Sequence, residues 1–212
     1  QNLTSASRRD RPTLLSSKGS DSVLLIRLKA THASIHITKP HLLINESLMS
    51  EVNNKYKVLF VCLGNICRSP AAQGIFEHIV RENGMTEKIA ADSAGLYGGH
   101  AGQHPDRRMR TAALYRGYGL THSARQVRGY DFNDFDLIVA MDDQNYEDLM
   151  HIAPSVEATH KIRRMAEYLT THKISYIPDP YYMGVEGFGL VLDLLEEGCQ
   201  NLFDSIVKAE SL

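Results

Sequence analysis

Residues 58–70 read Val-Leu-Phe-Val-Cys-Leu-Gly-Asn-Ile-Cys-Arg-Ser-Pro, and this stretch decides how the rest of the chain is interpreted. The apolar run 58–61 has no polar face, which is typical of a strand that is covered on both sides in a parallel sheet. The short loop 62–69 follows, and beyond it the apolar residues recur at helical spacing. A strand, a tight loop and a helix therefore follow one another directly.

The loop has the composition of an anion-binding site. Five residues separate Cys62 from Arg68, enough for successive backbone N–H groups to surround one anion, and the next helix adds its positive N-terminus. Gly64 and Asn65 are predicted to supply positive φ angles. Arg68 offers a planar donor fork that matches phosphate oxygens. The predicted phosphate-binding residues are Leu63, Gly64, Asn65, Ile66, Cys67 and Ser69.

Cys62 lies at the base of the predicted loop, where N–H donors and a cation favour the thiolate form of the sulfur. Ser69 can donate one further hydrogen bond to it. The competing interpretation is a buried structural cysteine near an unrelated surface arginine, since the Cys-x5-Arg spacing alone occurs by chance. The strand before the loop and the Ser-Pro pair after it favour the interpretation of Cys62 as a nucleophile.

The remaining pattern alternates strands with helices, which predicts an α/β domain of three layers with a parallel sheet. Buried-type strands are expected at 89–91 and 137–141, and weaker ones at 161–162 and 174–176. Helices are expected at 72–83, 105–117, 144–151 and 188–207.

Length and composition restrict the class of protein. The 212 residues suit one domain, and a net charge of −2 provides no general attraction for nucleic acid. No apolar run approaches the roughly 18 residues of a membrane span. Three cysteines do not make a disulfide framework and suit a reducing compartment. We therefore expect a cytoplasmic protein without nucleic-acid or membrane partners.

Residues 1–48 differ from the rest, because they hold seven Lys/Arg against three Asp/Glu, a net charge of +4. They resemble a transit peptide or a disordered tail, or they lie outside the natural protein. We favour the last interpretation, with translation beginning at Met49, because all seven methionines lie at or after that position. The expected functional domain is then 49–212.

The stretch from Val61 to Pro70 resembles the signature of low-molecular-weight protein tyrosine phosphatases, and the similarity extends from about residue 57 to residue 203. This resemblance implies a flavodoxin-like fold with a four-stranded parallel sheet and the loop at the carboxyl end of the first strand, where open α/β sheets bind ligands. It also implies a monomeric enzyme without cofactor or metal. The substrate would be a tyrosine-phosphorylated protein, hydrolysed through a phosphocysteine. Other blocks that resemble the family begin at Asp92, His104, Asp134 and Asp179.

Asp179 lies between two prolines, which restrict the backbone so that the carboxyl group can be positioned with little loss of entropy. Pro-Asp-Pro is also common turn chemistry, so the residues alone do not decide between these interpretations. The resemblance assigns Asp179 the role of general acid, a role that typically contributes about 10²–10⁴ in rate.

Aromatic residues are expected to form the wall of the pocket. Tyr181 and Tyr182 could stack on a phenyl phosphate, or they could pack against the last helix. The family usually carries another aromatic residue after Ser-Ala-Gly. Here Gly99 holds that position, and Tyr97 is the candidate for its role.

Three residues have supporting roles by resemblance. His122 and Asp142 match positions that order the phosphate loop, and Cys67 matches a cysteine that forms a reversible disulfide with the nucleophile. Ordinary polar packing would explain His122 and Asp142 equally well; for Cys67 the alternative is a small apolar loop residue, and we favour the redox role. Cys199 falls on the apolar stripe of the last helix and is expected in the core. A zinc site is disfavoured, because Cys62 and Cys67 lack a second Cys/His pair.

Three other functions remain open from the sequence. A thioredoxin-coupled arsenate reductase would need a cysteine relay, for which only Cys199 lies beyond the loop. A protein-arginine phosphatase tends to carry Thr where this chain has Ile66. A non-enzymatic phosphate-binding module would keep the loop but would not need both Cys62 and Asp179.

Overall fold

The computed structural model describes residues 55–212. The expectations for residues 1–48, and for a domain starting at 49, lie outside the described residues. Along the chain the elements are β1 (Tyr56–Cys62), α2 (Arg68–Glu82), β2 (Ile89–Gly95), η1 (Gly98–His100), α3 (Arg107–Tyr115), α4 (Asp131–Asp134), β3 (Leu137–Ala140), α5 (Asp143–Ile152), α6 (Val156–Thr159), β4 (Ile162–Arg164), η2 (Met165–Tyr168), η3 (Pro180–Tyr182) and α7 (Val185–Glu210).

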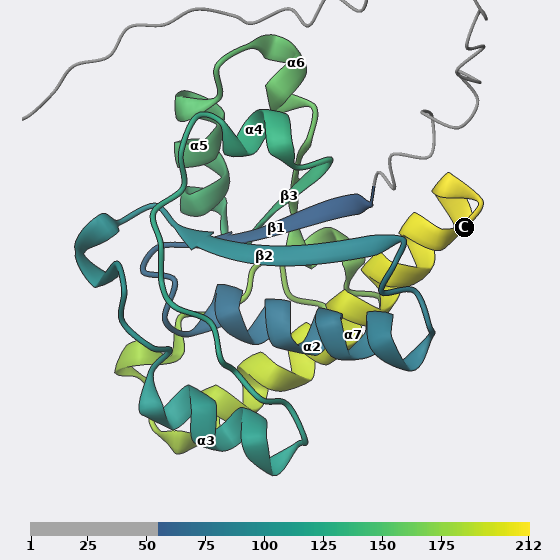
Figure 1. The fold of residues 1–212 in the computed structure, drawn as a ribbon. Helices are drawn as coiled ribbons and strands as arrows, with labels where there is room; N and C mark the ends of the chain where they lie inside the picture. The colour runs from purple at the N-terminus through teal and green to yellow at the C-terminus, as the bar shows by residue number, and fades with distance from the viewer. Residues whose placement is uncertain (1–54) are drawn as a thin grey trace, which may run out of the picture. The chain divides into compact units, whose positions relative to one another are not determined.

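The four strands form one parallel sheet in the order β2-β1-β3-β4. Successive side chains of a strand point to opposite faces, so Val58 and Phe60 join one hydrophobic cluster while Leu59 and Val61 join the other. Helices α2 and α7 lie against one face, and α4, α5 and α6 lie over the other (Figure 1). The predicted three-layer α/β fold with a four-stranded parallel sheet is confirmed.

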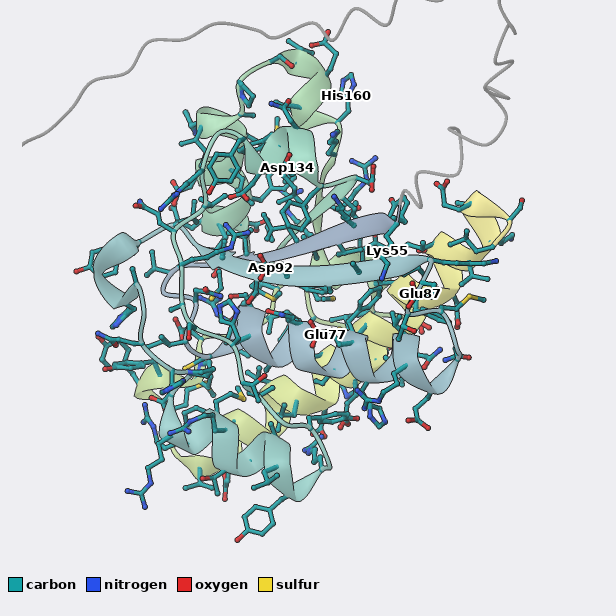
Figure 2. All side chains as sticks on the ribbon, in the orientation of Figure 1. Lys55, Glu77, Glu87, Asp92, Asp134 and His160 are labelled. Carbon is teal, nitrogen blue, oxygen red and sulfur yellow. The ribbon has the colours of Figure 1, made fainter. Side chains whose placement is uncertain are left out.

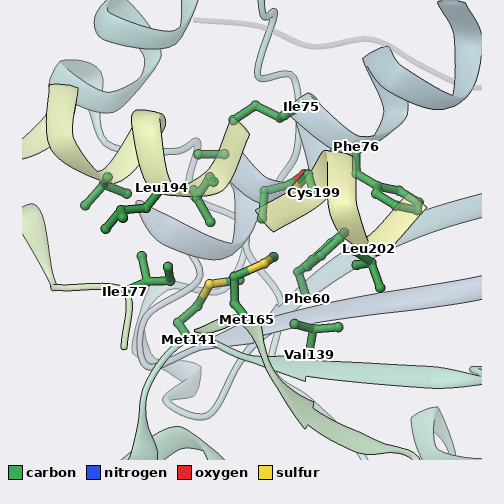
Figure 3. Close-up of a cluster of buried hydrophobic side chains, with 14 of the residues drawn as sticks. Phe60, Ile75, Phe76, Val139, Met141, Met165, Ile177, Leu194, Cys199 and Leu202 are labelled. Carbon is green, nitrogen blue, oxygen red and sulfur yellow. The ribbon is translucent and has the colours of Figure 1, made fainter. Parts of the chain in front are cut away.

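The larger of the two cores lies between the sheet and the pair α2 and α7, and Figure 3 shows part of it. The apolar stripe of α7 supplies fully buried residues such as Leu195 and Leu202. Cys199 is fully buried among them, and its sulfur lies 3.5 Å from the carbonyl oxygen of Ala72 on α2. Its predicted place in the core is confirmed.

The strand expected at 174–176 is wrong, because residues 175–176 form a bend and residue 174 has no regular structure. The preceding segment is held by a residue far away in the sequence: the Glu197 carboxylate on α7 accepts backbone N–H bonds from residues 170–172. The following segment contains two prolines, which cannot donate to a strand ladder. The segment then meets β3 only at its end, where Ile177 N–H donates to Met141 C=O at 2.7 Å.

The topology brings the carboxyl end of β1, which opens into the 62–69 loop, beside the segments that follow β2 and β3. This is the edge where open parallel sheets bind ligands. None of the helices within residues 55–212 combines the length and the hydropathy needed to cross a membrane.

Candidate active site

The phosphate loop (residues 62–69) is organised around the sulfur of Cys62. The backbone N–H of Asn65 points at this sulfur from 3.3 Å, and the Ser69 hydroxyl lies 3.0 Å from it. The loop closes at Arg68, the first residue of α2. Cys62 itself contributes to the lining of a pocket of about 190 Å³, whose other lining residues are Leu63, Gly64, Ile66, Cys67, Arg68, Tyr97, His100, Asp179, Tyr181 and Tyr182.

Asn65 determines the shape of the loop. It has a φ angle of 54°, in the left-handed region that few residues other than glycine adopt. Its amide nitrogen donates to the hydroxyls of Ser69 at 2.9 Å and Ser93 at 3.0 Å. Gly64 does not have the positive φ angle that the sequence predicted, so one left-handed residue is enough for this turn. Asn65 and Ser69 are fully buried behind the loop and do not line the pocket with their side chains.

A partly buried polar network supports Asn65 from behind. Its side-chain oxygen accepts from His122 Nε2 at 2.7 Å and from the Arg125 backbone N–H at 2.9 Å. The Arg125 side chain bridges Asp131 at 3.0 Å and Asp92 at 2.8 Å; Asp92 projects from β2 (Figure 2). Burial lowers the pKa of His122, and a neutral ring with its proton on Nε2 satisfies the Asn65 oxygen.

Arg68 connects the loop to the segment that carries the predicted acid. Its guanidinium donates to Asp142 at 2.5 Å, to the Ile177 carbonyl at 3.1 Å and to Asp179 at 3.1 Å. Burial disfavours its charge, but the negative groups of Cys62, Asp179 and Asp142 outweigh this, so the pKa of Arg68 is raised. Asp142 also caps α5 through Asn145 N–H at 2.7 Å, which fixes its carboxylate.

The carboxylate of Asp179 faces the pocket. One oxygen accepts from Arg68, and the other accepts from Tyr181 N–H at 3.1 Å as the cap of the short helix η3. The side chain keeps 43% of its surface exposed, so water can reach it. A thiol, a guanidinium and a carboxyl group therefore converge on one small cavity.

The wall of the pocket is aromatic. A Cβ atom added to Gly99 would lie 2.2 Å from the Tyr97 ring, so this ring fills the space beside residue 99. Tyr97 also packs edge-on against His100, at 5.7 Å between ring centres. On the other side, Tyr181 and Tyr182 pack edge-on at 4.9 Å. The three tyrosines predicted from the sequence all lie at the pocket.

Residues 57–212 match the model of the family described as low molecular weight phosphotyrosine protein phosphatase. The chain belongs to this family. The low molecular weight protein-tyrosine-phosphatase YfkJ of Bacillus subtilis is 42% identical over 158 residues, which cover 73% of this chain and 98% of the relative.

Solved structures agree with this assignment. A protein tyrosine phosphatase from Entamoeba histolytica superimposes with a TM-score of 0.71 at 43% identity, covering 74% of this chain and all of the other. The Drosophila arginine phosphatase superimposes with a TM-score of 0.66 at 34% identity, covering 70% and 96%. The flavodoxin-like fold and membership of a hydrolase family are thereby established for this phosphatase.

Sequence reasoning missed several residues of the phosphatase site. His100 lines the pocket, but it lies in an exposed turn where no motif marks it. Arg108 donates to the Tyr181 carbonyl at 3.0 Å across 73 positions of sequence, a contact that only the fold reveals. The bridge formed by Arg125 had a partial signal, because Asp92 opens one of the family-like blocks, but its partner Asp131 had none.

All three cysteines of the phosphatase are free thiols. Burial raises the pKa of the Cys67 thiol, and the nearby charges of Asp106, Cys62 and Asp179 act in the same direction. Within residues 55–212, no group of three His, Cys, Asp or Glu side chains is arranged to hold a metal ion.

Proposed function

We propose that this protein hydrolyses phosphotyrosine in proteins, with Cys62 as nucleophile, Arg68 as phosphate clamp and Asp179 as general acid. One observation supports the proposal most strongly. The Cys62 sulfur and the Asp179 carboxylate line the same pocket of about 190 Å³, and Arg68 joins the loop of one to the segment of the other. A module that only binds phosphate would not need both the Cys62 sulfur and the Asp179 carboxylate at one pocket.

In the first step, the Cys62 thiolate attacks phosphorus, so an S–P bond forms as the bond to the phenolic oxygen breaks. Backbone N–H groups of the loop and the Arg68 fork stabilise the equatorial oxygens of the phosphoryl group. Asp179 gives its proton to the leaving phenolic oxygen, which departs as neutral tyrosine. Ser69, 3.0 Å from the sulfur, stabilises the thiolate before attack and as it is released later.

In the second step, water attacks phosphorus, the S–P bond breaks and inorganic phosphate leaves. Asp179, now ionised, accepts the proton of the attacking water. Its exposed carboxylate at the pocket entrance can act on both the leaving group and the incoming water.

The test compares the wild type with Cys62→Ser and Asp179→Ala on p-nitrophenyl phosphate and a phosphotyrosine peptide, without added metal. Cys62→Ser is expected to be inactive, and Asp179→Ala to be slower by about 10²–10⁴. Activity of Cys62→Ser near that of the wild type would exclude the mechanism. Asp204→Asn, an exposed carboxylate change on α7, serves as the control.

Two alternative reactions can be measured in the same series. A phosphoarginine peptide tests the reaction of the Drosophila relative, which we expect to be slower because Ile66 presents no hydroxyl to the pocket. Arsenate with thioredoxin tests the reductase. We expect no turnover there, because Cys199 is fully buried in the core and cannot relay a disulfide from the loop.

We further propose a monomer that works in the cytoplasm on phosphoproteins, without nucleic-acid or membrane partners. The free thiols and the net charge of −2 support this placement. Size-exclusion chromatography tests the monomer, and fractionation of cells tests the location. An intact-mass measurement of the native protein tests whether residues 1–48 belong to it.

A further inference from the structure

A second hollow, the α3–α7 groove, lies between helix α3 and the first turn of α7 and has a volume of about 440 Å³. It is larger than the phosphate pocket, and no step of the proposed reaction uses it. Its lining combines cationic with apolar side chains, among them Arg107, Arg108, Ala112, Tyr115, Val185 and Phe188.

The groove adjoins the phosphate pocket at Arg108. The guanidinium lies over the ring of Tyr181 at 5.2 Å and over the ring of Phe188 at 4.8 Å. Tyr181 lines the phosphate pocket and Phe188 lines the groove. One side chain thus forms the partition between them, so a chain with its phosphotyrosine in the pocket passes next to the groove.

Apolar side chains are displayed at the rim of the groove. Tyr115 at the end of α3 is 89% exposed, and Val185 at the start of α7 is 84% exposed. Scattered apolar residues on a surface need no explanation, but a group around a hollow is typical of a binding site. The rim can bury one apolar side chain of a partner.

The charge of the groove selects the kind of partner. Helix α3 contains three arginines and no acid. Asp106 pairs with Arg108, whereas Arg107 takes part in none of the ion pairs found among residues 55–212. Glu186 lies on the first turn of α7 but not in the lining. The chain's own residues 1–48 carry a net charge of +4 and would be repelled, so an acidic partner is favoured.

We propose that the α3–α7 groove binds the substrate segment that flanks the phosphotyrosine. An acidic side chain of the substrate pairs with Arg107, and an apolar one lies between Tyr115 and Val185. This inference rests on the proposed function and names its substrate class: phosphoproteins with acidic and apolar residues within a few positions of the phosphotyrosine.

The experiment measures kcat/KM of the full chain on two phosphotyrosine peptides, one with acidic and apolar flanks and one with lysines in place of the acids. We expect the wild type to prefer the acidic peptide by about three- to tenfold, mainly through KM. Arg107→Glu should reverse the preference. Arg110→Glu makes the same change on an exposed residue of α3 outside the groove and should retain it. Tyr115→Ser should raise KM for both peptides, which share the apolar flank, and should leave their ratio unchanged.

Other results would overturn the inference. If the ratio of kcat/KM between the two peptides were equal for the wild type, Arg107→Glu and Arg110→Glu, the groove would not contact the flanks of the substrate. A change of oligomeric state in Arg107→Glu, seen by sedimentation without a change in peptide ratio, would assign the groove to a second copy of the chain. Absence of wild-type turnover on p-nitrophenyl phosphate and on both peptides would instead refute the proposed function.

Discussion

The phosphate loop and the acid segment (residues 177–183) meet at the same pocket but are built in opposite ways. The loop is held by buried side chains behind it: Asn65 and Ser69 are fully buried, and the Asn65 side chain alone bonds to four neighbouring groups. The acid segment is buried at Ile177 and Pro180, but Asp179 is 43% and Tyr182 93% exposed. Arg68 and Arg108 hold it from outside.

This difference corresponds to two chemical tasks. The phosphate loop stabilises charge in the transition state, and it must be in its final shape before the reaction, because rearranging it during the reaction would cost energy. An acid that first meets a leaving group and then a water must remain accessible to both. We therefore expect changes in the loop to act mainly on rate and stability, and changes in the acid segment to act mainly on the leaving group and on specificity.

Among the changes that test this contrast, the largest effect is expected where the two regions join. Arg68→Lys keeps the positive charge but loses the fork that contacts Asp142, Ile177 and Asp179 together. We expect kcat/KM on p-nitrophenyl phosphate to fall by about 10²–10³, the effect of losing one donor to transition-state charge. Arg81→Lys, on the exposed last turn of α2, is the matched control. A loss of kcat/KM below tenfold in Arg68→Lys would mean that a positive charge at residue 68 is enough to stabilise the phosphoryl group.

A smaller effect is expected from within the loop. Asn65→Ala removes four hydrogen bonds and leaves a Cβ residue at φ 54°. The free energy of unfolding should fall by about 1–3 kcal/mol, and kcat should fall by about tenfold because the loop amides lose their alignment. Denaturant unfolding and steady-state kinetics measure the two effects.

Asn65→Gly separates the effect of backbone strain from the effect of the lost hydrogen bonds, because glycine accepts the φ angle but makes none of the side-chain bonds. Compared with Asn65→Ala, we expect this variant to recover part of the lost free energy of unfolding but little of the lost kcat. If Asn65→Gly were as active as the wild type, the network of His122 and Ser93 behind the loop would have no role in catalysis.

The same contrast explains what the sequence could predict. The strand at 58–61 and the last helix follow from burial patterns that neighbouring residues carry, and the roles of Cys62 and Arg68 follow from a spacing dictated by one anion. These features are local. The structure confirms the strand and the helix, and it brings Cys62 and Arg68 to one pocket.

The features that sequence reasoning missed depend on distant partners. The strand expected at 174–176 does not form, and the segment just before it, residues 170–172, is bonded to Glu197, which lies more than 20 positions later. Gly64 was expected to need a positive φ angle, but Asn65 turns the loop alone. His100 reaches the pocket only because the turn after β2 folds over the loop. Such contacts leave no period or motif in the chain.

The anchor of residues 170–172, the segment that precedes the acid segment, gives a prediction that depends on pH. Partial burial opposes ionisation of Glu197, but the backbone N–H bonds from residues 170–172 and the hydrogen bond to the His172 ring outweigh it and lower its pKa. A lowered pKa stabilises the fold above the unfolded value of about 4.3, and this stabilisation is lost as the pH falls.

Glu197→Gln should therefore lower the free energy of unfolding by about 1–2 kcal/mol at pH 7, and this difference should shrink below about pH 4. We expect kcat to change by only about threefold, because the acid segment is still held by Arg68 and Arg108. Asp204→Asn, on the exposed face of the same helix, should show no such pH dependence. A destabilisation that is equal at pH 7 and pH 3.5 would contradict the assignment.

The smallest effect distinguishes the two tyrosines of the acid segment. Tyr181 is fixed by Arg108, which donates to its carbonyl and lies over its ring, whereas Tyr182 is 93% exposed. We expect Tyr181→Ala to lower kcat/KM for a phosphotyrosine peptide several-fold, since an aromatic pair contributes about 0.5–1.5 kcal/mol. Tyr182→Ala should change it by less than about twofold, as for other surface residues. If Tyr182→Ala had the larger effect instead, the ring that closes over the substrate would be Tyr182, and the acid segment would have to move on binding to bring it there.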